Sequence, residues 1–208
     1  MRGKMTTVIA IVIFIAGLSI FIYPHAKDYL DEKKHDEQVQ QYKHQQAKEK
    51  EASDKQKDKE QQEKDQKVKK SDKPVGYIEI KDADIKEPVY NGPATPKQLD
   101  KGVSLADKNE YKNDQNIAIA GHTDEIKDGY QFSDLKKKAH KGTKVKFSLG
   151  DDKEYEIKSI KNVNPDDTDV LKNKKKDYQE LTLITCDDYN PDTGNWEKRT
   201  VYKAKEVS

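Results

Sequence analysis

Cysteine, tryptophan and large apolar residues are scarce in this sequence. Its 208 residues include one cysteine and one tryptophan, and only 32% are hydrophobic against 38% that are charged. One cysteine excludes an internal disulfide, and the small apolar share excludes a single globular unit over the whole chain. The sequence therefore has to be read in segments, each with its own composition.

The only long apolar run lies near the amino terminus. Residues 6–23, TTVIAIVIFIAGLSIFIY, carry no charge and follow Arg2 and Lys4. A helix of this length spans about 27 Å, close to the ~30 Å hydrocarbon core of a bilayer. No small-x-small cleavage site follows, so we expect a retained signal-anchor rather than a cleaved signal peptide.

Lysines on both sides of the run do not decide its orientation by themselves. A short basic tail is typical of an anchor whose amino terminus is cytoplasmic. We therefore expect residues 1–5 in the cytoplasm, residues 6–23 as a single pass through the cell membrane, and the rest outside the cell.

Residues 24–74 consist mainly of Lys, Glu, Asp and Gln. Lysines and acidic residues nearly balance, so this segment is no basic arm for nucleic acid. Its few apolar residues, among them Val39 and Tyr42, keep no heptad register, which argues against a coiled coil. We expect a disordered or partly helical charged stalk that buries no core.

From residue 75 to residue 208, short alternating apolar runs are separated by Gly, Pro, Asn and Asp. Seven runs are typical of strands: Gly76–Ile80, Glu87–Tyr90, Asn116–Ala120, Thr143–Leu149, Glu154–Val163, Leu181–Thr185 and Lys198–Val207. Seven or eight strands with little helical periodicity predict one all-β domain, a barrel or a sandwich. Residues 94–105 are the best candidate for a short helical turn.

Cys186 and His122 each follow a run that predicts a strand. A cysteine and a histidine far apart in sequence are the minimum for catalysis by a nucleophilic thiol. Arg199 opens the last predicted strand, where a hairpin would bring it beside Cys186 to hold a carbonyl or stabilise an oxyanion. The remaining histidines are expected to be solvated: His25, His35, His44 and His140.

A buried structural cysteine is the alternative reading of Cys186. Outside a membrane and beside polar residues, a reactive thiol is favoured. Asp187 and Asp188 would raise the pKa of this thiol, which predicts a small thiolate fraction and a slow enzyme.

Several motifs agree in order and spacing with the class A sortases. GHT begins at Gly121, TLITCDDYN at Thr182 and GNWEKR at Gly194, and GYIEIKDADIKEPVYNGPATPKQLDKGVS begins at Gly76. The chain resembles this family over its whole length. The resemblance implies an eight-stranded β-barrel on the outer face of a Gram-positive membrane, which cleaves LPXTG-like sorting signals between Thr and Gly. It also implies transfer of the threonyl carboxyl to an amino group of the cell-wall precursor lipid II.

By this resemblance, Cys186 is the nucleophile that forms a thioester, and His122 is the general acid and then the base. Arg199 positions the substrate and stabilises the oxyanion, and the chemistry requires no cofactor. The groove for the sorting signal would be lined by Ala94, Ala106, Ala120, Thr168, Val170, Leu171, Ile184 and Thr185. Thr168 stands where the family usually has an aliphatic residue.

The segment DKNEYKNDQN offers oxygen ligands from Asp107, Glu110, Asp114 and Asn116. By itself this is as well explained as a solvated acidic loop, although calcium prefers such ligands. A calcium-stimulated subgroup of the family adds a glutamate where this chain has Asn173. We therefore expect calcium to be at most an activator, with weakened binding.

Two other functions are compatible with the sequence. A cysteine peptidase would resolve the thioester with water instead of an amine, and a tethered binding module would have no use for Cys186. In addition, the polar segment Asn164–Glu180 is expected to be mobile and to close on substrate.

Overall fold

The computed structural model describes residues 29–30, 32–49, 73–107, 115–123, 130–174 and 176–207. The expected cytoplasmic tail and anchor, residues 1–5 and 6–23, lie outside these ranges. Among the residues described, no helix is both long enough and apolar enough to cross a bilayer.

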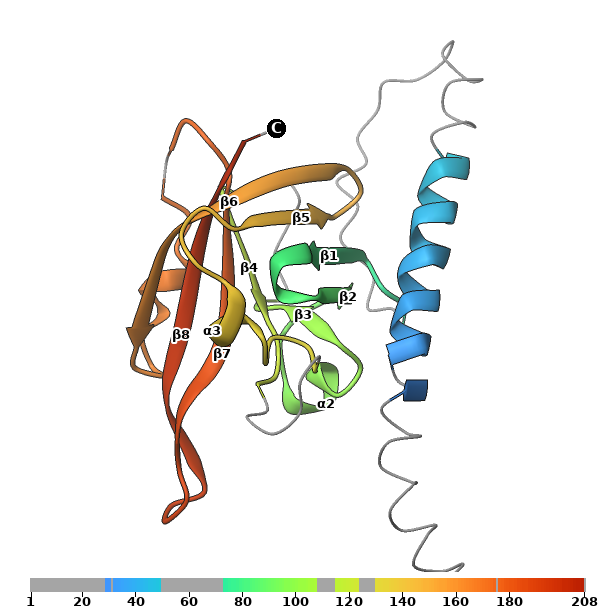
Figure 1. Ribbon diagram of the computed structural model, residues 1–208. Coiled ribbons are helices and arrows are strands. Elements are labelled where there is room, and N and C mark those ends of the chain that lie inside the picture. The colour runs from blue at the N-terminus through green and yellow to red at the C-terminus, as the bar shows by residue number, and fades with distance from the viewer. Residues whose placement is uncertain are drawn as a thin grey trace, which may run out of the picture.

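Eight strands form a closed barrel (Figure 1). They are β1 (Gly76–Ile80), β2 (Ile85–Tyr90), β3 (Val103–Leu105), β4 (Asn116–Ala120), β5 (Lys144–Ser148), β6 (Asp152–Val163), β7 (Glu180–Asn190) and β8 (Asn195–Glu206). The order around the barrel is β1-β2-β3-β4-β7-β8-β6-β5, with β2–β3 and β4–β7 parallel. The predicted all-β barrel is confirmed, and each of the seven predicted strands overlaps an observed one.

The barrel interior follows from the alternation of side chains along each strand. Ile117 and Ile119 of β4 and Leu181 and Leu183 of β7 are fully buried in one apolar cluster. Burying a side chain of this size contributes about 1.5–3 kcal/mol. The residues between them, Ala118 and Thr182, alternate to the outer face of the barrel but are themselves fully buried.

Short helices connect the strands. They are η1 (Lys81–Ala83), α2 (Pro96–Leu99), α3 (Leu135–Lys138) and η2 (Thr168–Leu171). The helical turn expected over residues 94–105 is shorter than predicted: Thr95 caps α2 by accepting a hydrogen bond from the Gln98 N–H, and residues 103–105 form β3. The apolar residues Val103 and Leu105 alternate into the core, so tertiary packing overrides the helical prediction there.

β7 and β8 form a long hairpin whose turn projects beyond the barrel (Figure 1). The sequence placed Cys186 at the end of a strand, which is wrong, because β7 continues for four residues beyond it. After Cys186, Asp187 pairs with Lys198, Tyr189 with Trp196 and Asn190 with Asn195. The two aromatic rings pack with centroids 5.1 Å apart.

Part of the expected stalk is a helix that packs against the barrel beside β1 and β2 (Figure 1). Residues 29–30 and 32–49 are helical, and Val39 is fully buried. The expectation that residues 24–74 bury nothing is therefore wrong for this stretch. Its partly buried positions recur at helical spacing but are mostly polar, which hid them from an apolar pattern: His35, Gln38, Val39, Tyr42, Lys43 and Gln46.

Candidate active site

Strand register brings together Cys186, His122 and Arg199. β4 and β7 run parallel with Ala120 opposite Ile184, and the Gly121 N–H donates to the Ile184 carbonyl at 3.1 Å. His122 and Cys186 each lie two residues further along these neighbouring strands. Arg199 is the direct antiparallel partner of Cys186 on β8. Cys186 and Arg199 are thus paired across β7 and β8, and His122 follows the end of the neighbouring strand β4 by two residues.

All three side chains belong to the outer face of the barrel. Leu181 and Leu183 point inward, so Ile184 and Cys186 point outward by alternation. The same alternation directs the Thr185 side chain inward, where it is 2% exposed. The backbone of Thr185, and not its hydroxyl, therefore borders the expected groove.

His122 is held on both sides of its peptide backbone. Its N–H donates to Oε1 of Gln131 at 2.7 Å, and its carbonyl accepts from the Phe132 N–H at 3.0 Å. The imidazole stacks on Tyr130 at a centroid distance of 6.1 Å, and its Nε2 lies 3.8 Å from the exposed carboxylate of Asp100. The backbone is therefore fixed while the ring stays accessible, as proton transfer to a substrate requires.

Close packing explains the glycine before this histidine. A Cβ at Gly121 would lie 2.7 Å from the ring of Phe132, which is itself fully buried. Any side chain here would push the strand end away from the core and displace His122.

Burial raises the pKa of the Cys186 thiol, and the nearby positive charge of Arg199 acts to lower it. The predicted direction is confirmed, but the aspartates are not its cause. Asp187 points into the barrel, where its carboxylate pairs with Lys136 and accepts hydrogen bonds from Asn162 at 2.9 Å and Thr200 at 3.0 Å. Its negative charge is therefore already compensated on the opposite face of the strand.

The guanidinium of Arg199 is oriented by the hairpin itself. One of its nitrogens donates to the carbonyls of Trp196 and Lys198, at 3.1 and 2.8 Å. A fixed cation opposite the thiol can stabilise negative charge that develops on a bound carbonyl oxygen.

The residues expected to bind the sorting signal fall into two groups. Ala94, Ala106, Ala120 and Ile184 lie around the paired ends of β3, β4 and β7, where Ala94 N–H donates to the Ala106 carbonyl at 3.3 Å. Thr168, Val170 and Leu171 belong to η2, which hydrogen bonds join to β4. Apart from Thr185, these side chains are all at least partly exposed.

Of the four expected calcium ligands, Asp107 and Asn116 lie within the described residues. Glu110 and Asp114 lie outside the described residues, and no group of three or more metal-ligating side chains occurs within them. Both polar atoms of the Asn116 amide are engaged, Nδ2 with the Val170 carbonyl at 2.9 Å and Oδ1 with the Thr182 hydroxyl at 2.6 Å. Oδ1 of Asn173 accepts from the Asn116 N–H at 2.7 Å. These neutral amides hold η2 to β4 by direct hydrogen bonds.

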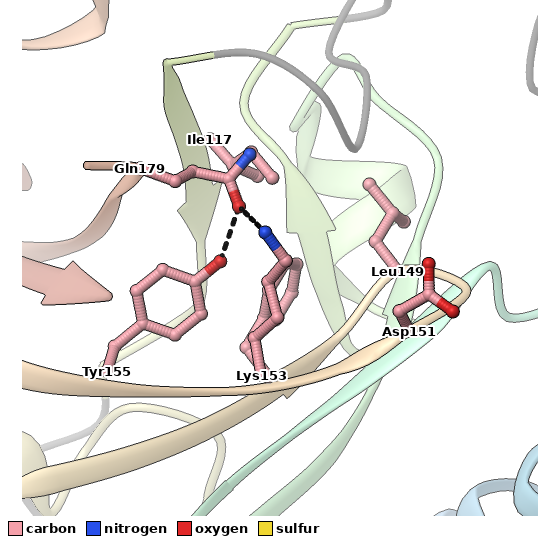
Figure 2. A pocket seen from close by; sticks show the side chains of 7 residues that line it. Ile117, Leu149, Asp151, Lys153, Tyr155 and Gln179 are labelled. Carbon is pink, nitrogen blue, oxygen red and sulfur yellow. Dashed lines mark hydrogen bonds between the residues drawn. The ribbon is translucent and has the colours of Figure 1, made fainter. Parts of the chain in front are cut away.

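A small cavity lies at the other end of the barrel (Figure 2). Its volume of about 30 Å³ is enough for about one water molecule. Gln179 accepts hydrogen bonds there from Tyr155 at 2.7 Å and from Lys153 at 3.0 Å (Figure 2). Gln179 precedes Cys186 by seven residues along an extended chain, which is about 23 Å, so this cavity is separate from the thiol.

Sequence reasoning missed three residues near His122: Gln131, Glu87 and His35. Gln131 lies in a segment without a recognisable motif, Glu87 lies in a predicted strand where no pattern singles it out, and His35 was expected to be solvated. Its imidazole instead lies 2.8 Å from the Glu87 carboxylate.

Comparisons with known proteins agree on one family. A family model described as the sortase domain matches residues 78–207. Sortase A of Staphylococcus aureus is 48% identical over 206 residues, covering 99% of this chain and 97% of that protein. Sortase A of Bacillus anthracis is 29% identical over 192 residues, covering 89% and 88% of the two chains.

Solved structures are similar as well. Listeria monocytogenes sortase A matches with a TM-score of 0.56 and 25% identity, covering 65% of this chain and 88% of that one. A sortase D5 transpeptidase of Clostridium perfringens matches with a TM-score of 0.59 and 22% identity, covering 84% and 98% of the two chains, a likeness of fold.

Proposed function

The chain belongs to the sortase family of cysteine transpeptidases, and from this premise we propose that it cleaves LPXTG-type sorting signals between Thr and Gly. The threonyl carboxyl is then joined to an amino group of lipid II, which attaches the surface protein to the cell wall. The observation that carries this proposal is the register that pairs Cys186 with Arg199 across β7 and β8, beside the neighbouring strand β4 that ends two residues before His122.

In the first half-reaction the Cys186 thiolate attacks the threonyl carbonyl, and Arg199 stabilises the oxyanion. Protonated His122 gives its proton to the glycine nitrogen as the Thr–Gly bond breaks and the thioester forms. In the second half-reaction neutral His122 takes a proton from the acceptor amine as that amine attacks the thioester. Collapse of this second oxyanion forms the new amide and releases the Cys186 thiolate.

Because burial raises the pKa of the Cys186 thiol, only a minor share of the enzyme holds the reactive thiolate at neutral pH. Such an enzyme is slow, which suits a reaction whose two substrates are both held near one membrane. We propose that residues 6–23 provide the anchor, with residues 1–5 cytoplasmic and the barrel outside the cell.

Calcium is proposed as a weak activator at most. Of the groups that would bind it, Asn116 and Asn173 are neutral and already joined to each other. Their hydrogen bonds support an η2 segment that stays close to β4 without a metal ion.

The test uses the full chain in detergent, an LPXTG peptide and triglycine, with mass spectrometry of the products. We expect cleavage after Thr and a triglycine adduct, both absent in Cys186→Ala. Cleavage without an adduct in the presence of triglycine would instead support a peptidase. No cleavage, with or without calcium, would return the chain to the class of tethered binding modules.

A further inference from the structure

Two buried polar residues, Glu87 and Gln131, have no part in the mechanism above. Glu87 lies opposite Ile78 in the β1–β2 ladder, on the interior side, and is 5% exposed. Gln131 is 1% exposed and has a left-handed backbone with φ of 44°. Burying such groups is costly unless they are paired, and a positive φ is strained for a residue with a side chain. Their partners therefore show what these residues support.

Gln131 joins His122 to the end of α2. Its Oε1 accepts the His122 N–H at 2.7 Å, and its Nε2 donates to the Leu99 carbonyl at 2.6 Å. Asp100, the next residue after Leu99, lies 3.8 Å from the His122 ring. One buried amide thus fixes both the backbone that carries the imidazole and the turn that carries a carboxylate beside it.

Glu87 joins Gln131 to the amino-terminal helix. Burial raises the pKa of its carboxyl, His35 and the Gln131 backbone N–H act to lower it, and its Oε2 lies 2.8 Å from Nδ1 of His35. Asp36, next to His35, makes an ion pair of 2.6 Å with Lys86, which neighbours Glu87. Glu87 and Gln131 therefore lie between the helix and the candidate general acid and base.

The carboxyl-terminal half of the helix contacts the barrel through other residues. Tyr42 accepts a hydrogen bond from the Gly150 N–H at 3.0 Å, and Lys43 lies 3.4 Å from Glu79 and 4.4 Å above the Tyr77 ring. These contacts hold the helix on β1 and the β5–β6 turn but do not touch Glu87. They provide a means to loosen the helix without altering the path to His122.

We propose that Gln131 and Glu87 are positioning residues for His122, and that His35 completes them, so that the docked helix helps to set the geometry of the catalytic histidine. This inference rests on the proposed function, in which His122 transfers the proton. The helix follows the expected membrane anchor directly, so its docking couples the site to the attachment of the enzyme.

The test compares His35→Ala and Gln131→Met with the wild-type full chain in detergent, by peptide turnover and by NMR of the His122 imidazole. Displacements of catalytic groups by about 1 Å cost up to ~100-fold in rate. We expect kcat about 10-fold lower in His35→Ala and lower still in Gln131→Met, with KM within about twofold and the His122 resonances shifted. His35→Asn, whose amide nitrogen can replace Nδ1, restores most of kcat.

Lys43→Ala is the matched control, because it removes one helix contact away from Glu87. We expect its kcat and its His122 resonances to match those of the wild type. Wild-type values in His35→Ala, or an equal loss in Lys43→Ala, would overturn the inference. If the wild-type chain neither cleaves nor transfers the peptide, the proposed function fails. The His122 resonances still test the coupling between the helix and His122 in that case. Unshifted resonances in His35→Ala would overturn the coupling.

Discussion

Cys186 combines a buried thiol with a fixed cation. Burial raises its pKa, and Arg199 across the β7–β8 ladder opposes that rise. Because the chain has one cysteine, every thiol measurement on the protein reports on this residue alone. The balance between the two effects decides how much thiolate is present at neutral pH.

Removing the charge of Arg199 shifts this balance. We expect alkylation of Cys186 by iodoacetamide to begin at higher pH in Arg199→Met than in the wild type, because the thiolate loses its nearby cation. Mass spectrometry across a pH series measures the shift. Arg199→Lys retains the charge, so its alkylation should follow nearly the same pH profile as that of the wild type. If Arg199→Met and the wild type are alkylated with the same pH profile, the electrostatic role of Arg199 is contradicted.

Asp187 has a structural role opposite the thiol. Although burial acts to raise its pKa, hydrogen bonds from Lys136 and Thr200 hold that pKa below the usual aspartate value. A carboxyl with a lowered folded-state pKa stabilises the fold above its unfolded pKa of about 4 and loses that contribution as pH falls through the folded value.

Asp187→Asn should therefore lower the free energy of unfolding by about 1–3 kcal/mol at pH 7, with a smaller loss near pH 3. Thermal unfolding of both proteins at several pH values measures the difference. Asp188→Asn, at an exposed position, is the control. If the loss of unfolding free energy in Asp187→Asn is as large in acid as at pH 7, the charge of Asp187 is not what stabilises the fold.

The sequence was sufficient to predict which residues meet at the site but not how their neighbours support them. Cys186 and His122 follow apolar runs that are easily recognised, and strand pairing does the rest. The contact between Gln131 and His122 depends on a chain reversal and a left-handed residue, neither of which leaves a pattern in the residues. The inward direction of Asp187 likewise follows from β7 continuing past Cys186, where the polar sequence predicted a loop.

At the scale of elements, η2 carries part of the expected groove and depends on amides for its position. Asn173 and Asn116 join the segment before β7 to β4 at 2.7 Å, and Lys176 N–H adds a contact of 3.3 Å to Gln115. The expected mobility of Asn164–Glu180 stays a prediction, since these contacts describe one position of the segment.

Introducing a carboxylate at residue 173 should create calcium dependence. The wild-type rate is expected to change by less than about twofold between EDTA and millimolar calcium, because Asn116 and Asn173 are neutral and hydrogen-bonded to each other. Asn173→Glu should be activated several-fold by calcium and Asn173→Gln should not, as measured by peptide turnover. Strong activation of the wild type at low calcium would contradict this expectation.

At the scale of the whole molecule, the described part of the chain consists of a barrel and a helix, and the apolar pattern of the sequence did not predict that the two pack together. The alternation of apolar residues predicted the barrel because its core obeys the two-residue period of strands. The helix of residues 32–49 packs through histidine, glutamine, tyrosine and lysine, with Val39 as its fully buried apolar residue. From the sequence alone, a helix face of that composition cannot be distinguished from a solvated stalk, because its polar residues give no sign of the partners they contact.

Val39→Asp should release this helix from the barrel, at a cost of about 2 kcal/mol for the lost burial. Hydrogen exchange of the full chain measures it: amides of residues 32–49 should lose protection while β7 and β8 keep theirs. Gln41→Asp, on the exposed side of the helix, should exchange like the wild type. Unchanged protection in the Val39 variant would mean that the helix does not depend on this contact.

The central claim is that Cys186 forms a thioester with the threonine of a sorting signal. Intact mass spectrometry of the full chain, quenched in acid during reaction with an LPXTG peptide, tests it directly. We predict one adduct on Cys186, whose mass equals that of the substrate peptide up to Thr less one water. Digestion should locate it on the fragment that contains Cys186, and the adduct should disappear when triglycine is added. Product formation without any adduct on Cys186, or an adduct that persists in Cys186→Ala, would contradict the account.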